Sequence, residues 1–101
     1  MPEAPVVEPE QTTDTRTQEA PRWKVLLHDD DVTTIDFVVW LLMRVFAKPA
    51  EEAVELTLKV HRTGLAIVTI TSFERAELYV EQVHSLARPR GFPLTATIEK
   101  A

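Results

Sequence analysis

The sequence contains no cysteine and only two glycines, and these shortages remove several classes of function. Without cysteine there can be no disulfide and no thiolate metal site. Gly64 and Gly91 lie far apart, so no glycine-rich loop can cradle a phosphate. No apolar run approaches the roughly 20 residues that span a membrane, and no basic segment followed by an apolar one marks a signal peptide. We therefore expect a cytoplasmic protein without a membrane partner.

Positive charge is also scarce, with 11 basic side chains against 16 acidic ones and a formal net charge of −5. Nucleic acids favour basic surfaces, so the balance argues against a nucleic-acid partner.

A chain of 101 residues has room for one domain at most. No internal repeat is visible, and no large exposed apolar patch can be inferred, so we expect a monomer.

The first 21 residues differ in composition from the rest of the chain. They contain four of the seven prolines, no aromatic residue, and five acidic side chains against one arginine. Such a segment cannot bury enough apolar surface to offset the entropy lost on ordering. The sequence therefore predicts a disordered N-terminal extension over residues 1–21 and a folded domain over residues 22–101.

The first half of the domain predicts a strand followed by two helices. Residues 23–28 are rich in strand-forming side chains. Thr33 is placed to cap a helix, with Asp36 three residues on in the position of a capping-box acid. Apolar side chains occupy nearly every side of this helix up to Phe46, which predicts that it is buried centrally. Pro49 suits the first turn of a second helix, and Gly64 is a stop signal for it.

The second half predicts a strand, a helix and a last strand. Residues 65–71 have no polar interruption except threonine, and Thr71 or Ser72 is placed to begin the third helix. Alternating apolar residues over 94–98 indicate a half-buried final strand. The predicted fold is a single small α+β domain of order β-α-α-β-α-β. Its three helices would pack against a mainly antiparallel three-stranded sheet.

Few residues could support chemistry. The run Asp29-Asp30-Asp31 lies between the first strand and the first helix, and His61 lies on the second helix. A metal site could join the aspartates to His61, although hard cations and zinc both want more ligands than these. The simpler interpretation, which we favour for the aspartates alone, is a solvated turn and helix cap. His61 alone would more often be a packed or surface histidine.

No other side chain suggests catalysis. His28 and His84 have no partner that the sequence identifies, so we expect them to be structural or exposed. No serine or lysine has the setting of an activated nucleophile. The sequence therefore predicts a protein that is not an enzyme and that needs no metal or other cofactor.

Four blocks of the sequence resemble the ClpS family of Clp protease adaptors, in order and with nearly the family's spacing. The first has the family pattern of an aromatic residue, Lys-Val, an acidic turn and a helix start. The others resemble Leu-x-Val-His-x-x-Gly, Glu-x-Ala-Glu and the ending His-Pro-Leu-x-Cys-Thr-hydrophobic-Glu-Lys. They are Trp23–Val38, Leu58–Gly64, Glu74–Glu77 and Phe92–Lys100, and the resemblance covers residues 22–101.

The resemblance implies a fold of three strands and three helices, in agreement with the order derived above. It also implies an adaptor that binds N-degron substrates, also called N-end rule substrates, through a bulky hydrophobic N-terminal residue and its free α-amino group. The adaptor would deliver them to an AAA+ Clp protease, ClpAP or ClpCP, through the N-terminal domain of a ClpA-type or ClpC-type unfoldase. The alternative is a divergent adaptor that docks to the unfoldase with altered or lost N-degron specificity.

The resemblance also assigns residues to these tasks. An ammonium has three donors and needs acceptors around it, among which carboxylates bind most strongly. The family pattern gives that role to Asp29, Asp30 and His61. The resemblance places the side-chain pocket at Ile35, Thr57, Val60 and Leu94, with Asp31 and Thr33 supporting its rim. Taken alone, Val60 and Leu94 could equally be ordinary core residues.

Several residues at this site depart from the family pattern. Asp29 stands where the family usually has Asn and adds a negative charge. Ile35 replaces the Met that gates the pocket, and its β-branched side chain is stiffer. Thr34 replaces the preceding Pro, and Thr57 replaces a second pocket Met. We therefore expect a reshaped pocket whose preference is shifted toward Leu or bulkier aromatic residues.

The resemblance places unfoldase docking on the third helix, at Glu74 and Tyr79, where Tyr79 replaces a family Lys. Glu74 could equally be an acidic residue favoured by the start of a helix. Residues 1–21 resemble the flexible extension that the family uses during delivery, although they could be a passive linker.

The sequence leaves two other interpretations open. A ribosomal stalk-type domain shares this general fold, but the lysine-rich helix face and the alanine- and glycine-rich hinge of that family are absent. A small metal-dependent enzyme would use the aspartate turn and His61.

Overall fold

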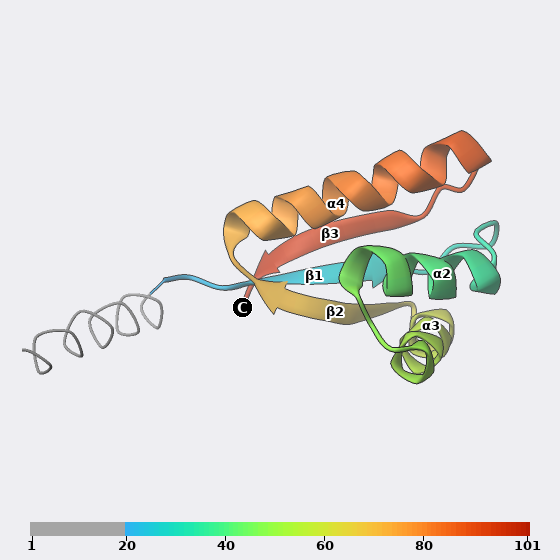
Figure 1. The fold of residues 1–101 in the computed structure, drawn as a ribbon, viewed down its shortest axis with the longest axis horizontal. Helices are drawn as coiled ribbons and strands as arrows, with labels where there is room; N and C mark the ends of the chain where they lie inside the picture. The colour runs from blue at the N-terminus through green and yellow to red at the C-terminus, as the bar shows by residue number, and fades with distance from the viewer. Residues whose placement is uncertain (1–19) are drawn as a thin grey trace, which may run out of the picture.

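The computed structural model describes residues 20–101, so the predicted N-terminal extension lies outside the described residues except for its last two. The element order confirms the predicted β-α-α-β-α-β arrangement, with one added turn of 3-10 helix, η1 (Figure 1). The elements are β1 (Trp23–His28), α2 (Ile35–Phe46), α3 (Ala50–Thr63), β2 (Leu65–Thr71), α4 (Phe73–Ala87), η1 (Arg88–Arg90) and β3 (Thr95–Lys100).

The three strands form one sheet in the order β2-β1-β3, and both pairings are antiparallel. Trp23 at the start of β1 lies opposite Thr71 of β2 and Lys100 of β3. His28 at its end lies opposite Leu65 and Thr95. The turn that follows β1 and the turn that precedes β2 therefore both lie at the His28 end of the sheet. The aspartate run begins at this end.

The helices pack around this sheet as the apolar spacing predicts. Helix α4 packs against β1 and β3, α3 against β2, and α2 against both other helices (Figure 1). Val25 and Leu27 of the central strand are fully buried between the sheet neighbours and the helices. The largest fully buried side chains are Leu27, Leu41, Leu42, Leu94, Val25 and Val83.

Helix α2 is not buried on all sides, so that prediction was wrong. Phe37, Leu41 and Leu42 face the core, whereas Trp40 and Met43 are 40% and 44% exposed. A three-stranded sheet with two neighbouring helices is too small to surround a third helix, because a domain of this size leaves much of its apolar surface in water. The all-round apolar pattern therefore leaves an aromatic side chain on the outer face of α2.

The helix ends show two small corrections and one confirmation. The cap of α2 is Thr34, one residue later than predicted, and its hydroxyl accepts a hydrogen bond from the Phe37 amide at 3.1 Å. Pro49 is the cap of α3 and precedes its first turn. Gly64 ends α3 as predicted, with a φ of 96° that favours glycine because it has no Cβ.

Candidate functional site

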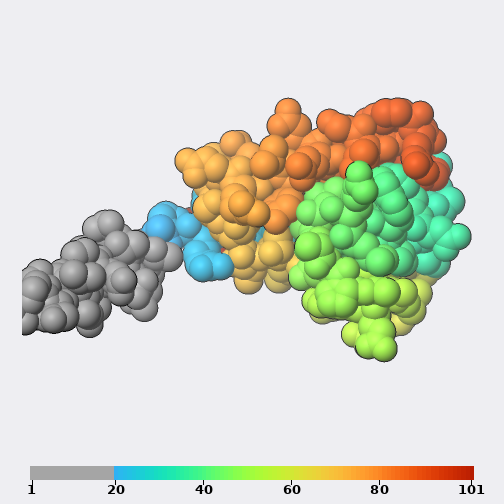
Figure 2. Space-filling model, in the orientation of Figure 1, coloured from blue at the N-terminus to red at the C-terminus, as the bar shows by residue number. Residues whose placement is uncertain are grey.

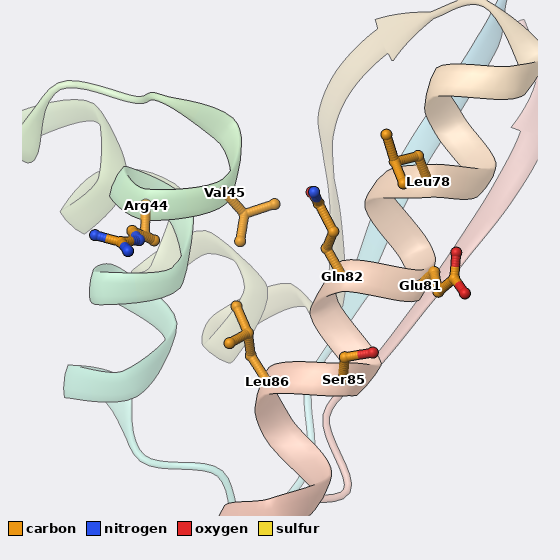
Figure 3. Close-up of a pocket in the computed structure, with 7 residues that line it drawn as sticks. All are labelled: Arg44, Val45, Leu78, Glu81, Gln82, Ser85 and Leu86. Atoms are coloured by element: carbon orange, nitrogen blue, oxygen red, sulfur yellow. The ribbon is translucent and has the colours of Figure 1, made fainter.

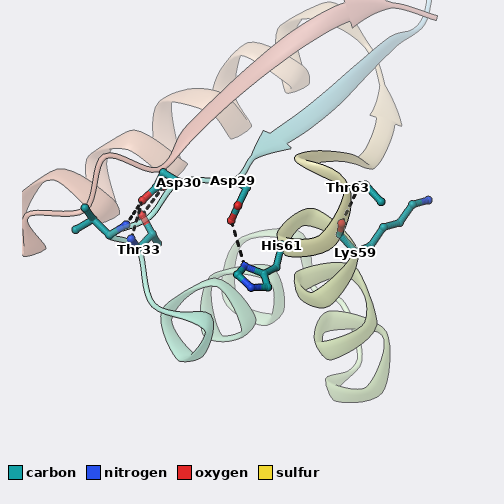
Figure 4. Close-up of polar contacts among 7 residues, drawn as sticks. Asp29, Asp30, Thr33, Lys59, His61 and Thr63 are labelled. Carbon is teal, nitrogen blue, oxygen red and sulfur yellow. Dashed lines mark hydrogen bonds and ion pairs between the residues drawn. The ribbon is translucent and has the colours of Figure 1, made fainter.

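The turn between β1 and α2 is braced by the carboxylate of Asp30. One of its oxygens accepts hydrogen bonds from the amides of Val32, at 2.8 Å, and Thr33, at 2.7 Å. The other accepts from the Thr33 hydroxyl at 2.7 Å (Figure 4). The favoured interpretation of the aspartate run as a turn thus holds for Asp30, and Thr33 serves this turn and does not cap the helix.

Partial burial raises the pKa of Asp30, but the hydrogen bonds outweigh it and hold that pKa below its usual value. The largest opposing contributions come from the amide and hydroxyl of Thr33, followed by the Val32 amide and the positive charge of Arg88. Donors that point at a carboxylate favour its ionised form. Asp30 is therefore a fixed negative charge at the end of β1.

Asp29 and His61 face each other across the gap between this turn and α3. The Nδ1 atom of His61 lies 3.6 Å from an Asp29 carboxylate oxygen (Figure 4). The Asp29 amide donates to the Gly64 carbonyl at 2.8 Å, which fixes the backbone of the turn to the end of α3. The His61 side chain is 61% exposed and the Asp29 side chain 32% exposed, so both are accessible from water.

A small hollow connects these polar groups to apolar side chains of the core. It is lined by His28, Asp29, Asp30, Thr33, Ile35, Val38, Thr57, Val60, His61 and Leu94, and its volume is about 20 Å³. Every residue that the sequence assigned to the ammonium contact and the side-chain pocket is here, except Asp31, which is exposed on the turn and does not line the hollow. Asp29 and His61 lie at the accessible rim, while Val60 and Leu94 are 4% and 1% exposed.

Thr57 contributes less polarity to this hollow than its residue type indicates. Its side chain is 3% exposed, and its hydroxyl donates to the Ala53 carbonyl at 2.7 Å. Because the hydroxyl is satisfied by its own helix, the threonine methyl is left as the apolar part of the wall. Ile35, in contrast, is 44% exposed in the first turn of α2 and borders both the hollow and solvent.

Sequence reasoning missed two lining residues, His28 and Val38. Val38 lies three residues after Ile35 on α2, so helical spacing could have placed it on the same face. The Nε2 atom of His28 lies 2.7 Å from the Thr97 hydroxyl of β3, which corrects the expectation that this histidine has no identifiable partner. That contact joins neighbouring strands whose pairing the sequence does not reveal.

His84 also has a partner that the sequence did not identify. The Ala96 amide donates a hydrogen bond of 3.1 Å to its Nε2 atom, joining α4 to β3. Burial lowers the pKa of His84, and the positive charge of Arg88 lowers it further. A neutral ring is what this geometry needs, because a protonated imidazole has no acceptor atom.

A larger hollow lies elsewhere, in a groove of about 460 Å³ between α2 and α4 (Figure 3). These two helices lie side by side on the face of the molecule shown in Figure 2. The groove is lined by Arg44, Val45, Leu78, Glu81, Gln82, Ser85 and Leu86. It brings together no histidine and only one carboxylate, so it offers nothing comparable to the Asp29 and His61 pair.

Glu74 and Tyr79 lie on α4, in the half that begins next to the Trp23 end of the sheet (Figure 1). Glu74 is exposed in the first turn of the helix. The Tyr79 ring is half-buried and stacks on Phe46 with centroids 4.6 Å apart, and the Arg75 guanidinium donates to its hydroxyl at 3.3 Å. Glu74 thus lies near the Trp23 end of the sheet, whereas the aspartate turn follows the His28 end, and neither Glu74 nor Tyr79 lines the small hollow.

Over residues 20–101, no group of three or more histidine, aspartate or glutamate side chains is arranged to hold a metal ion. Within the same residues, no helix has the length and apolar character needed to cross a bilayer.

Comparisons with known proteins show the family to which this chain is similar. Residues 18–97 match the family model described as "ATP-dependent Clp protease adaptor protein ClpS". The chain is 46% identical over 89 residues to the ClpS adapter protein of Desulfatibacillum aliphaticivorans, covering 87% of this chain and 86% of that one. It is 48% identical over 85 residues to that of a Ruegeria species, covering 84% and 75%.

A solved structure is similar as well. Agrobacterium tumefaciens ClpS2, determined with bound L-phenylalaninamide, superposes with a TM-score of 0.78 and 31% identity over 80% of this chain and 98% of that one. The family match also separates this chain from ribosomal stalk-type domains. On the family model and the curated relatives together, the chain belongs to the ClpS family of adaptor proteins for ATP-dependent Clp proteases.

Proposed function

We propose that this adaptor captures proteins by an N-terminal residue with a free α-amino group and a bulky hydrophobic side chain. The observation that carries the proposal is the hollow in which Asp29, Asp30 and His61 surround an apolar floor. The similarity to ClpS2 supports it, because the L-phenylalaninamide in that structure has a free amino group, an aromatic side chain and an amide in place of a carboxylate.

The α-ammonium would bind between Asp29 and His61. A nitrogen at the usual hydrogen-bond distance of about 2.7–3.2 Å from each acceptor fits between atoms 3.6 Å apart. Asp29 supplies the carboxylate and a neutral His61 ring supplies the second acceptor. Asp30 contributes its fixed negative charge and the one lone pair that the turn does not use. An acetylated N-terminus lacks the charge and two of the donors, so it would be rejected.

The side chain of the N-terminal residue would enter the apolar part of the hollow. Its present volume of about 20 Å³ is too small for leucine or phenylalanine, so a wall must move. Ile35 is the candidate gate, because it is the exposed apolar member of the lining. Burying a large apolar side chain against Val60 and Leu94 contributes about 1.5–3 kcal/mol, which favours opening. We propose a preference shifted toward Leu or bulkier aromatic residues.

Delivery would use the opposite end of the molecule. Glu74 and Tyr79 would contact the N-terminal domain of a ClpA-type or ClpC-type unfoldase in the cytoplasm, with the adaptor acting as a monomer. Separation along the sheet would let one molecule hold substrate and unfoldase at once.

Residues 1–21 would take part in the transfer of substrate to the unfoldase. Deleting residues 1–18 is therefore expected to slow degradation by ClpAP or ClpCP while peptide affinity stays unchanged. Equal losses in both assays would contradict this division.

The capture step is tested by fluorescence anisotropy with labelled peptides that differ only at residue one: Leu, Phe, Tyr, Trp, Val, Gly and an acetylated Leu control. We expect saturable binding of the bulky free N-termini, and none of the Gly or acetylated peptides.

The second candidate is an adaptor that docks to the unfoldase but no longer discriminates N-terminal residues. The small hollow and the branched Ile35 favour it. Absence of binding to every peptide, with retained association with a ClpA or ClpC N-terminal domain, would establish this alternative and refute the capture proposal.

A further inference from the structure

A second, aromatic hollow lies beside the site, at the outer face of α2. It has a volume of about 220 Å³ and is lined by Thr34, Asp36, Phe37, Trp40, Arg90 and Phe92. The guanidinium of Arg90 lies over two rings of α2, 5.3 Å from the Phe37 centroid and 5.5 Å from the Trp40 centroid. The Phe37 ring also packs on Trp40 and Phe92, with centroids 5.7 Å and 4.9 Å apart.

The two hollows share the first turn of α2. Ile35 lines the site, while its immediate neighbours Thr34 and Asp36 line the aromatic hollow. An extended peptide advances about 3.3 Å per residue, so a chain whose first residue occupies the site can reach across this turn with its second or third.

The aromatic hollow has an unused binding surface. Trp40 is 40% exposed, and its ring meets only Phe37 and the Arg90 guanidinium among the aromatic and cationic groups of residues 20–101. A further ring placed against Trp40 would extend the existing stack and would also meet Arg90. Aromatic pairs and cation–π contacts each add favourable energy beyond area burial.

On the assumption that the proposed capture function holds, we propose that this hollow selects an aromatic side chain at the second or third residue of the substrate. An acidic side chain is the other chemistry that Arg90 could recognise. Asp36 lines the same hollow, however, and the neighbouring turn carries Asp29, Asp30 and Asp31, so a carboxylate would be repelled. Trp40, Phe37 and Arg90 would thus be specificity-determining residues downstream of the N-terminal pocket.

The test uses the full chain and labelled peptides that all begin with Leu and carry Trp, Phe, Ala or Glu at residue two or three. At one of these positions, we expect Trp and Phe peptides to bind about 3- to 10-fold more tightly than the Ala peptide. Trp40→Ala and Arg90→Ala should remove that difference without changing affinity for the Leu-Ala peptide. Met43→Ala is the matched control, because Met43 is similarly exposed on α2 but does not line the hollow.

Four results would overturn the inference. Equal affinity for all downstream residues, with discrimination at residue one intact, would refute the aromatic hollow and leave the capture proposal standing. Tighter binding of the Glu peptides would assign the hollow to anions. An equal loss for every peptide in Trp40→Ala would mean that Trp40 only supports the fold. Failure of every Leu peptide to bind would refute both proposals.

Discussion

Two histidines occupy the same local position in this protein but lie in different surroundings. His61 is in the last turn of α3 and His84 in the last turn of α4. The His61 side chain is 61% exposed and faces the Asp29 carboxylate at 3.6 Å. His84 is half-buried and accepts a hydrogen bond from the Ala96 amide of β3. One ring is available to a ligand, while the other is used by the fold.

The aspartates of the turn divide in a similar way, with Asp30 used mainly by the fold and Asp29 available to the site. Both oxygens of Asp30 accept hydrogen bonds from the turn, whereas Asp29 faces only His61 among the described residues. The difference teaches that residue type and helix position do not assign a polar side chain to binding or to stability. The element packed next to the side chain decides its role. Each prediction below tests the distinction between side chains that bind substrate and side chains that stabilise the fold.

The largest expected effect is a loss of peptide affinity when Asp29 or His61 is replaced. His61→Ala and Asp29→Ala should each weaken binding of a Leu-starting peptide about 10- to 100-fold. A lost hydrogen bond to a charged group costs about 1.5–3 kcal/mol. Anisotropy gives the affinity, and urea unfolding should show a change in the free energy of unfolding below about 0.5 kcal/mol, as for other exposed positions. A large loss of stability in either variant would show that the replaced side chain stabilises the fold.

The next effect is on stability, at Asp30. Asp30→Ala removes the acceptor of three hydrogen bonds in the turn and should lower the free energy of unfolding by roughly 2 kcal/mol. Asp31→Ala is the matched control, since Asp31 is exposed and accepts no hydrogen bond among residues 20–101. Similar stabilities for the two variants would show that the turn does not depend on Asp30.

A smaller effect, which depends on pH, is expected at His84. Its pKa is lowered in the folded protein, so the unfolded chain binds the proton more readily. The stabilising contribution is therefore complete above the unfolded pKa of about 6.5 and is lost as pH falls below it toward the folded value. Urea unfolding at pH 7.5 and pH 5.5 should show this loss, and His84→Gln should reduce it. An unchanged pH dependence in His84→Gln would contradict this prediction.

The smallest effect is expected in the groove between α2 and α4. Leu78→Ala removes a side chain that is 51% exposed and lines this groove, yet it should leave affinity for the N-terminal peptides unchanged within error. Anisotropy with the Leu and Phe peptides checks this. A loss comparable to that of His61→Ala would mean that the groove, and not the small hollow, binds the peptide.

Much of the fold follows from local features of the sequence. Gly64 ends α3 because its φ of 96° suits glycine, and Ser72 caps α4 through a hydrogen bond from the Arg75 amide. These signals act over a few residues and can be recognised without the rest of the chain. The one-residue error at Thr33 arose because two adjacent threonines are equally able to cap, and only the use of Thr33 by Asp30 decided between them.

The residues of the peptide site were named from a family resemblance, and the structure brings all of these but Asp31 to one hollow. Spacing alone could not have joined Asp29 to His61, because they are 32 positions apart and meet only through the β1–β2 pairing and the Gly64 contact. The size of the hollow and the exposure of Trp40 could not be predicted from the sequence either, because both depend on how closely α2 approaches its neighbours.

The sequence by itself determined the element order, most of the helix ends and the chemical types available to the site, because caps, breakers and apolar spacing act locally. The tertiary structure alone decided which polar side chains remained accessible. Asp29 and His61 meet where β1 and α3 end side by side, while His84 of α4 accepts a hydrogen bond from β3. The physical reason is that accessibility and hydrogen-bond partners depend on distant chain segments, whose approach is set by the packing of the whole core.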